Sequence, residues 1–496
     1  MHNRTAHLFH VFCAVVDSKP MFRFLLFVVL LTELSACRSV GSYAADVSDS
    51  VSDDSNIREL TVLYTNDEHG WMQGREPGKG AANLLGLWQE KEGYYEDGPF
   101  LLLSGGDHWT GPAISTWFEG EGMVEVMNAM HYDATAIGNH EFDFGLDNLQ
   151  QRINQADFPY LAANIFRNDT QETLSDLGIL ASTIVETNGL RIAIIGLSTI
   201  YTPQTTNPVN VANLTFADYE PVLRKTVSSL DASSVDMIFV IAHVCMASLE
   251  PLANAVADLN ISLMGGGHCN ELVARQIGDT IMLESSGHYR SYARANFRYD
   301  IESNEMVSMG YAAVINTDGS ANATIEQIIS RWHKATEAEL SSELGFLPIE
   351  IQPDDDRLQS LVVSSWLDID RSADIAINNR LALRAPLPEG IITLADVVGL
   401  LPFENTIIAV QLTGAEILQI IKEGQRPFVA GMNQPLDEES TYKVLVNSFM
   451  YAGGAEYTSI AEFDDAGYDT EIHYRQPLVE WFQAQHSSID NPLVFP

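Results

Sequence analysis

Five short apolar stretches of this sequence are each followed by side chains of the types that bind metal ions. Asp67 and His69 come after residues 60–64, and Asp107 comes after residues 100–103. The other positions are Asn139 with His140 after residues 134–137, His243 after residues 237–241, and His268 after residues 261–264. Because open α/β sheets place their sites beyond the carboxyl ends of their strands, we expect five strands to deliver these side chains to one sheet edge.

The types of these side chains narrow the choice of metal. Carboxylate, amide and imidazole groups without thiolates favour Mn²⁺, Zn²⁺, Fe or Co²⁺ over a structural zinc site built on cysteines. A lone Asp-x-His pair would indicate little, because a hydrogen-bonded surface histidine is the commoner explanation. Five such groups, each at the end of an apolar stretch and several beside glycines that let the backbone approach closely, indicate one metal centre.

The segments between these groups favour an α/β fold. Short apolar stretches such as 191–195 and 237–241 alternate with helical segments, which is the pattern of strands joined by helices. The helix expected at 122–130 carries its methionines on one face, so we expect them in the core. A polar-faced helix is expected near 324–343, ending at Gly345 and connecting two domains.

Three motifs resemble those of the calcineurin-like metallophosphoesterases, and in particular the 5′-nucleotidase family of the bifunctional UDP-sugar hydrolase/5′-nucleotidase type. They are TNDEHG at 65–70, GNHEFD at 138–143 and GGGHCN at 265–270. The resemblance covers roughly residues 57–490. It implies a four-layer α/β/β/α sandwich of two mixed sheets that holds a dinuclear metal site, followed by a smaller α/β nucleotidase C-terminal domain.

The same resemblance implies how the chain is divided. The metallophosphoesterase domain would span 57–323, the linker helix 324–345, and the substrate-binding C-terminal domain 346–496.

The resemblance also assigns the metal ligands. Asp67 and His69 would bind the first metal ion, and Asp107 would bridge both ions. The second ion would be completed by Asn139, His243 and His268. Asn270 stands where the family usually has His or Gln, and its shorter amide makes a weaker ligand of the first metal. Whether the ions are Mn, Zn or Co is left open.

His140 and Asp143 are the expected catalytic pair. Two metal ions would generate hydroxide from water near neutral pH and neutralise charge on the phosphoryl oxygens. His140 would then stabilise the transition state or protonate the leaving oxygen, and Asp143 would orient it. The structural alternative for Asp143 is a helix N-cap.

The C-terminal part resembles the nucleoside-binding domain of the family. Phe403 and Phe449 match the two aromatics that hold the base, and Asn379 with Arg384 matches the pair near the phosphate. A core position is an equally good reading of Phe403. The family's glycine run is replaced by Arg380-Leu381-Ala382, and its ribose carboxylate is replaced by Ala455, followed by Glu456. The true substrate therefore stays open.

These features predict a dinuclear-metal phosphohydrolase that cleaves 5′-nucleotides to nucleoside and phosphate by metal-activated hydroxide. One alternative is a hydrolase of UDP-sugars, cyclic nucleotides or other esters in the same superfamily. The other is a catalytically silent binding lipoprotein, which the eroded nucleoside motifs favour and the intact metal motifs oppose.

Residues 1–36 have the architecture of a bacterial signal region with Met21 as the expected start. Its apolar run is too short to span a membrane. The tetrapeptide LSAC at 34–37 resembles a lipobox, which implies lipid on the Cys37 sulfur. An ordinary cleaved signal is the alternative. Residues 37–56 indicate a flexible tether. The chain would be secreted across the inner membrane and anchored at the periplasmic face or the outer membrane.

The composition limits the partners. The chain has 67 Asp+Glu against 27 Lys+Arg, a formal net charge of −40, which disfavours binding to polymeric nucleic acid. A small phosphorylated substrate would need local positive charge, which bound metal ions supply. Cys245 and Cys269 lie beside two predicted ligands, and they form either a local disulfide or two buried thiols. The oligomeric state is not predicted.

Overall fold

The computed structural model describes residues 54–231, 234–317, 319–424 and 426–495. The predicted signal region, the lipidation site at Cys37 and the tether up to residue 53 lie outside the described residues.

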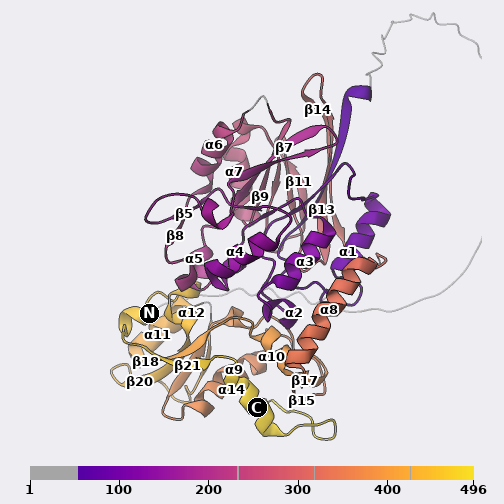
Figure 1. Cartoon of the computed structure of the whole chain (residues 1–496). Coiled ribbons are helices and arrows are strands. Elements are labelled where there is room, and N and C mark those ends of the chain that lie inside the picture. The colour runs from indigo at the N-terminus through magenta and orange to yellow at the C-terminus, as the bar shows by residue number, and fades with distance from the viewer. Residues whose placement is uncertain (1–53, 232–233, 318, 425, 496) are drawn as a thin grey trace, which may run out of the picture. The chain divides into compact units, whose positions relative to one another are not determined.

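Two mixed six-stranded sheets form the N-terminal part (Figure 1). In the first, three strands run parallel to β1 on one side, and β13 and β14 continue antiparallel on the other. Its strands in spatial order are β14 (Glu305–Ile315), β13 (Ser291–Asp300), β1 (Ile57–Thr65), β2 (Phe100–Ser104), β3 (Ala134–Ala136) and β4 (Tyr160–Leu161). The second sheet has parallel central strands and antiparallel edges. Its order is β11 (Val273–Ile277), β12 (Thr280–Glu284), β10 (Ile261–Gly265), β9 (Met237–Ala242), β7 (Leu190–Leu197) and β6 (Ser182–Thr187).

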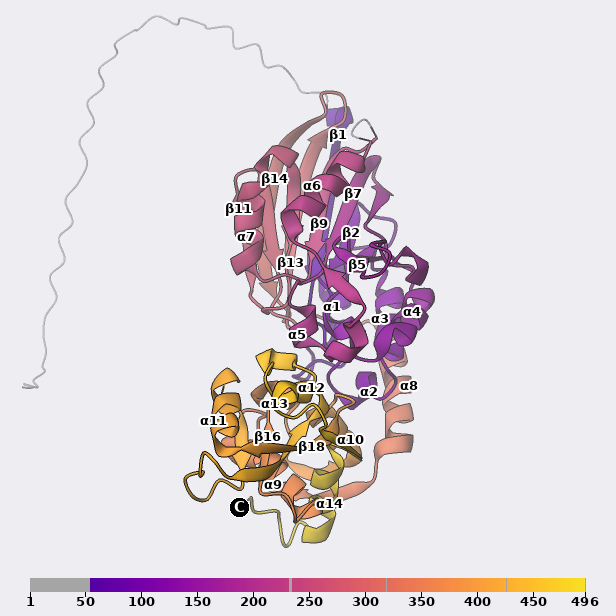
Figure 2. The same ribbon diagram turned by 90° about the vertical axis from the view of Figure 1, so that its left-hand side faces the viewer.

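The two sheets pack face to face, and helices cover their outer faces (Figure 2). Inward residues such as Tyr64, Phe239 and Phe297 form the apolar layer between the sheets. The first sheet is covered by α1 (Ala81–Leu87), α3 (Glu121–Met130) and α4 (Gly145–Gln155). The second sheet is covered by α6 (Tyr219–Ser229) and α7 (Met246–Ala255). This arrangement confirms the predicted four-layer α/β/β/α sandwich. The methionines of α3 are buried, as expected.

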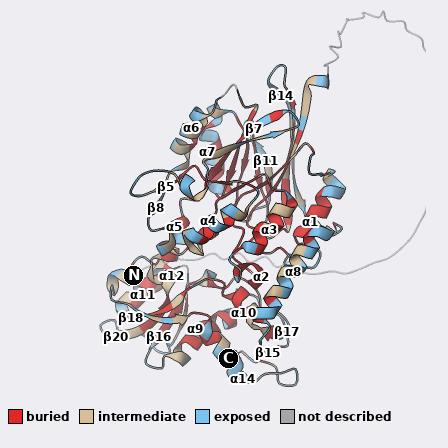
Figure 3. Cartoon of the chain, viewed as in Figure 1, coloured by how far each residue is buried: buried red, intermediate tan, exposed pale blue. Residues whose placement is uncertain are grey.

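A third sheet of five strands lies in the C-terminal part. Its order is β19 (Phe428–Ala430), β16 (Ile375–Asn378), β20 (Thr441–Asn447), β18 (Thr406–Thr413) and β21 (Tyr468–His473). One face packs on α9 (Asp356–Ile369), α10 (Leu394–Leu400) and α14 (Gln476–Gln485). The other packs on α11 (Gly414–Glu423), α12 (Ser448–Tyr451) and α13 (Ile460–Phe463). Buried residues run through both faces of this sheet (Figure 3), which confirms the smaller α/β part.

The remaining elements are short, apart from the helix α8. Two strand pairs are β5 (Ile165–Arg167) with β8 (Leu214–Phe216), and β15 (Glu343–Leu347) with β17 (Gly390–Thr393). The short helices are α2 (Ala113–Thr116) and α5 (Thr202–Thr205). Among the described residues, no helix is both long enough and apolar enough to cross a membrane.

The helix expected to end at Gly345 is α8, which spans Ala323–Leu340. The expected end is wrong, because Gly345 lies in β15 and pairs with Ile392 of β17. The start agrees within a residue, and the side chain of Asn322 caps it by accepting from the backbone N–H groups of Thr324 and Ile325. The predicted domain limits themselves stay a prediction.

Candidate metal centre

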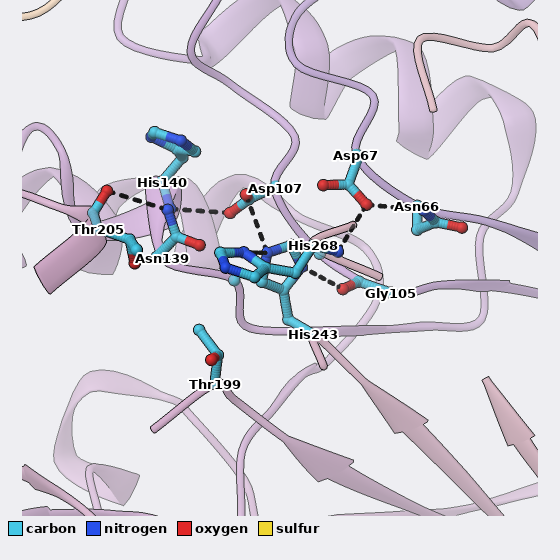
Figure 4. A network of polar contacts seen from close by, with 12 residues as sticks. Asn66, Asp67, Gly105, Asp107, Asn139, His140, Thr199, Thr205, His243 and His268 are labelled. Atoms are coloured by element: carbon cyan, nitrogen blue, oxygen red, sulfur yellow. Dashed lines mark hydrogen bonds and ion pairs between the residues drawn. The ribbon is translucent and has the colours of Figure 1, made fainter. Parts of the chain in front are cut away.

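The carboxyl ends of five strands meet at one place, where the predicted metal-type side chains gather (Figure 4). β1, β2 and β3 are parallel neighbours in the first sheet, whereas β9 and β10 are parallel neighbours in the second. The expectation of one sheet edge is therefore wrong. Two facing sheets share the site, because the strand that carries each ligand motif ends at the same end of the sandwich.

The backbone around the site is strained. Five of the predicted ligand residues have positive φ values, namely Asp67 (53°), His69 (46°), Asp107 (63°), His268 (74°) and Asn270 (54°). Each such conformation costs a residue with a Cβ atom about 1–3 kcal/mol, and such residues concentrate at functional sites. The surrounding fold therefore holds these side chains in positions that their own conformational preferences oppose.

Asp107 lies at the centre of the cluster. The ligand atoms of His69, Asp107 and His140 lie within 4.8 Å of one another, as do those of Asp107, His243 and His268. The Oδ2 atom of Asp107 is 2.9 Å from His243 Nε2 and 4.0 Å from His69 Nε2. Its Oδ1 atom accepts from the backbone N–H of His140 at 2.8 Å. Asp107 thus has the position required of a residue that bridges two cations.

Hydrogen bonds orient the carboxylate of Asp67. Its Oδ2 atom accepts from Asn66 Nδ2 at 2.7 Å and from the backbone N–H of His268 at 2.9 Å. Its Oδ1 atom is buried without a hydrogen-bond partner and lies 3.7 Å from His69 Nε2. One oxygen is therefore fixed by the protein, and the other is left for a ligand.

Backbone carbonyls orient two of the histidines. His69 Nδ1 lies 3.1 Å from the carbonyl oxygen of Thr110, and His243 Nδ1 lies 2.8 Å from that of Gly105. A ring nitrogen that donates to a carbonyl leaves the other nitrogen deprotonated, which is the arrangement of metal-binding histidines. The Nε2 atoms of both residues face the Asp107 carboxylate.

Unpaired oxygens show that the cluster fits a cation. Besides Asp67 Oδ1, the amide oxygens of Asn139 and Asn270 are buried without a hydrogen-bond donor. The Asn139 amide is oriented by its Nδ2 group, which donates to the carbonyl oxygen of Thr205 at 3.2 Å. A buried oxygen without a partner costs about 1–3 kcal/mol, and coordination to a divalent ion would remove that cost. Asn270 therefore remains a ligand candidate despite its short side chain.

The predicted catalytic pair is in contact. His140 Nδ1 lies 2.7 Å from Asp143 Oδ2. The hydroxyl of Thr110 donates to the same oxygen at 2.6 Å, and the hydroxyl of Thr206 donates to Oδ1 at 2.8 Å. The N-cap alternative for Asp143 is wrong, since helix α4 is preceded by Phe144 and has no side-chain cap. Burial alone would lower the pKa of His140, but the carboxylates of Asp143 and Asp107 raise it above its usual value.

Three supporting residues were not predicted. Glu141 accepts from the backbone N–H groups of Asp107, His108 and Gly138 at 2.7–3.0 Å, so it fixes two ligand loops together. Glu141 lies inside a recognised motif and could have been suspected from it. Thr110 and Thr206 carry no such signal, because Thr110 follows Asp107 outside the three recognised motifs and Thr206 lies in a loop without a metal-type residue.

A cavity of about 720 Å³ opens beside the cluster. The four predicted substrate residues line it, namely Asn379, Arg384, Phe403 and Phe449. Phe403 stacks on the His140 ring at 5.7 Å with an interplanar angle of 22°, and the Arg384 guanidinium lies 5.7 Å from the Phe403 ring centre. The structure therefore places the C-terminal residues against the predicted catalytic histidine.

Two details of this cavity bear on recognition of the substrate. The amide oxygen of Asn379 already accepts from Asn447 Nδ2 at 2.7 Å, so that oxygen is engaged within the protein. Ala455 and Glu456 both line the cavity, and both have positive φ values. A carboxylate is thus present at the wall, one residue beyond the position at which the resemblance places it.

The structure pairs Cys245 with Cys269 in a disulfide. This settles the alternative that the sequence left open. The disulfide ties the segment after His243 to the segment that begins with His268, so it joins two ligand-bearing loops of the second sheet.

Comparisons with known proteins agree with this geometry. Residues 354–433 match the family described as "5′-nucleotidase, C-terminal domain". A 5′-nucleotidase of Vibrio vulnificus is 25% identical and covers 87% of this chain and 91% of its own length. The protein UshA of Escherichia coli is 25% identical and covers 80% of this chain and 86% of its own length.

A solved structure has the same fold. The 5′-nucleotidase precursor of Thermus thermophilus superposes with a TM-score of 0.74 at 21% identity, covering 87% of this chain and 97% of the other. The matched part includes both the two-sheet sandwich and the C-terminal sheet. Residues 354–433 therefore match the 5′-nucleotidase C-terminal domain, and the chain as a whole has the two-part fold of the 5′-nucleotidase precursor of Thermus thermophilus.

Proposed function

We propose that the protein is a divalent-metal-dependent phosphohydrolase that releases phosphate from 5′-nucleotides. The observation that carries this proposal is the pair of ligand-atom groups that share Asp107, one of which includes His140 of the His140–Asp143 pair. Three buried oxygens without donors at the same place support binding of cations there. The 5′-nucleotidases found among its relatives support the class of substrate.

We propose that two ions bind. The first would be held by Asp67, His69 and Asn270, and the second by Asn139, His243 and His268, with Asp107 shared. When bound, the ions would lower the pKa of water and neutralise charge on the phosphoryl oxygens. Mn²⁺, Zn²⁺ and Co²⁺ all suit this mixture of carboxylate, amide and imidazole groups.

The chain itself supplies the proton for the leaving group. Asp143 holds His140 by Nδ1, so the opposite ring nitrogen, Nε2, is free to carry a proton toward the cavity. Attack of water on phosphorus breaks the bond to the nucleoside oxygen, and the proton from Nε2 passes to that oxygen. Phe403, stacked on the His140 ring, excludes water from one face of the imidazole.

The nucleoside would occupy the larger cavity. Phe449 and Phe403 offer aromatic surface for the base, and Arg384 offers positive charge near the phosphate. Glu456 is the proposed partner of the ribose hydroxyls, because Ala455 has no polar side chain. The departures of the C-terminal part, with Arg380-Leu381-Ala382 and Ala455, also motivate a second candidate, a hydrolase of UDP-sugars, cyclic nucleotides or other esters.

The test follows phosphate release from AMP, dAMP and an aryl phosphate, and formation of UMP and glucose 1-phosphate from UDP-glucose, with Mn²⁺, Zn²⁺ or Co²⁺ added. The Asp107→Ala variant is the control, because it removes the shared ligand. Loss of AMP hydrolysis in the control supports the nucleotidase assignment. Cleavage of UDP-glucose without phosphate release from AMP would favour the second candidate, and no cleavage of any of these esters would refute both.

We also propose that the protein is secreted and anchored by lipid on Cys37, and that its N-terminal domain ends at residue 323, where the linker helix α8 begins. The anchor rests on the LSAC tetrapeptide at 34–37. Metabolic labelling with a fatty acid in a bacterial host tests it, with Cys37→Ser as the control. Label retained in that variant would contradict the proposal.

A further inference from the structure

A second, smaller cavity of about 220 Å³ adjoins the metal-type cluster. It shares His69, Asn270 and Arg384 with the larger cavity. Its remaining wall includes Trp71 from the loop after β1 and Arg290 from the loop between β12 and β13. The two cavities therefore meet at ligand residues of the proposed first metal.

Two arginines line this smaller cavity, and a third lies beside its wall. Arg290 and Arg384 line it, and the Arg75 guanidinium lies 5.1 Å from the ring centre of Trp71, which also lines it. In the part of the chain that the structure describes, no carboxylate lies within 4 Å of any of the three guanidinium groups. The guanidinium of Arg290 instead donates to the carbonyl oxygens of Ser286 and Gly287. We call this cavity, with its three arginines, the arginine pocket.

The lack of a carboxylate in contact with these arginines is unusual in this chain, where acidic residues outnumber basic ones by 67 to 27. Two nearby glutamates are already engaged: Glu76 pairs with Lys79, and Glu350 accepts from Gln352. Burial, followed by the charges of Arg290 and Arg384, lowers the pKa of Arg75, while Glu350 opposes the shift. The three arginines therefore repel one another, and an anion in the pocket would relieve that repulsion.

His288 adds an unpaired polar atom to the same wall. Its Nδ1 atom is buried without a hydrogen-bond partner, and its ring centre lies 5.6 Å from that of His69 and 5.8 Å from that of Trp71. Its backbone N–H donates to the carbonyl oxygen of Asp67 at 2.8 Å, which holds the loop against the cluster. In the neutral ring, the tautomer with its hydrogen on Nδ1 would donate to an oxyanion.

We propose that the arginine pocket binds a second phosphate-type anion beside the phosphoryl group that is hydrolysed. This inference rests on the proposed function and deepens it. Guanidinium groups match the paired oxygens of phosphate, and they bind it by charge-assisted hydrogen bonds. The anion is either the second phosphate of a substrate with two linked phosphates, such as a nucleoside diphosphate or a diphosphate ester, or free inorganic phosphate.

The experiment compares three variants of the full chain. Arg290→Ala and Arg75→Ala each remove one arginine of the pocket. Arg191→Ala is the matched control, because it removes an exposed arginine on β7 that pairs with Glu186. For each variant, kcat/KM is measured for a nucleoside monophosphate and for the matching diphosphate. The inhibition constant of inorganic phosphate is measured with an aryl phosphate as substrate.

If the anion is the second phosphate of a substrate, each pocket variant lowers the ratio of kcat/KM for the diphosphate to kcat/KM for the monophosphate. The expected decrease is about tenfold or more, the size of a lost charge-assisted hydrogen bond. If the anion is instead free inorganic phosphate, that ratio stays constant, and the inhibition constant of inorganic phosphate rises by about tenfold or more. If both quantities match those of Arg191→Ala in both pocket variants, the proposal is overturned.

A binding measurement separates this proposal from the proposed function. Calorimetric titration with inorganic pyrophosphate and with inorganic phosphate is performed on chelator-treated protein, where no turnover is possible. The pocket is supported if the wild type binds either anion and Arg75→Ala binds it about tenfold or more weakly. This result would hold even if no ester is hydrolysed. Equal binding by the wild type and both pocket variants, or no binding by any of them, overturns it.

Discussion

Replacing Asp143 by asparagine should slow hydrolysis of a nucleotide much more than hydrolysis of an activated ester. Asp143 accepts from His140 Nδ1 at 2.7 Å, from Thr110 at 2.6 Å and from Thr206 at 2.8 Å. An asparagine side chain accepts only through its one oxygen, and it carries no charge. The imidazolium of His140 therefore loses its charged partner, while the shape of the side chain is kept.

The magnitude follows from that single contact. A hydrogen bond to a charged group contributes about 1.5–3 kcal/mol, so kcat/KM for AMP should fall by about 10- to 150-fold. The assay is phosphate release from AMP and from 4-nitrophenyl phosphate by the Mn²⁺-loaded protein. Nitrophenolate leaves without a proton, so its hydrolysis should fall by only about threefold or less if His140 acts on the leaving oxygen.

Thr206→Val is the matched control, because it removes a neutral donor to Asp143 and keeps the carboxylate. Its loss on AMP should be smaller than that of Asp143→Asn, because the charged contact between Asp143 and His140 is kept. Equal losses on the two esters in Asp143→Asn would refute the leaving-group role of His140. So would an Asp143→Asn variant with the AMP activity of the wild type.

Three further predictions concern stability and metal binding. The double variant Cys245→Ser, Cys269→Ser should lose about 3 kcal/mol of unfolding free energy, because the disulfide closes a loop with a sequence separation of 24. Urea titrations measure this loss, and an unchanged unfolding midpoint would contradict it. In the absence of metal, Asn270→Asp should be less stable than the wild type, because it adds a buried charge that only a cation neutralises. On addition of Mn²⁺ its Tm should rise by more than that of the wild type. A smaller rise than in the wild type would count against Asn270 as a ligand. Burial raises the pKa of Asp133 from 3.8 to about 6, so the folded state binds more protons than the unfolded state between these pH values. The unfolding free energy therefore falls as pH rises from about 4 to 6, by at most about 3 kcal/mol. The asparagine of Asp133→Asn does not titrate, so that component of the pH profile of stability should be absent in the variant. A profile identical to that of the wild type would refute the assignment.

Much of the fold was predictable because the strands that carry the ligands are apolar and end at recognisable residues. Residues 237–241 have almost no polar position, and β9 is observed at Met237–Ala242. The sharing of the site by two sheets was not predictable from strand ends alone, since the ligand motifs look alike in both sheets. The end of α8 was missed because Ser341 and Ser342 give no strong stop signal, and Gly345 is used in a strand instead.

The site was predictable only where its residues lie within motifs. The His140–Asp143 contact follows from a spacing of three residues, which brings both side chains to one side of a tight turn. Thr206 reaches Asp143 from 63 residues away, and no local pattern marks it. The arginine pocket joins loops from distant parts of the chain, so its unpaired charges emerge only from the folded arrangement.

The most direct test of the account is the metal content of the purified protein, measured by elemental analysis after loading with Mn²⁺ and removal of free metal. A dinuclear site requires about two ions for each wild-type chain, and Asp107→Ala should lose metal, since Asp107 belongs to both groups of ligand atoms. A wild-type chain that retains no metal, or an Asp107→Ala variant that retains the full amount, would contradict a dinuclear site that shares Asp107.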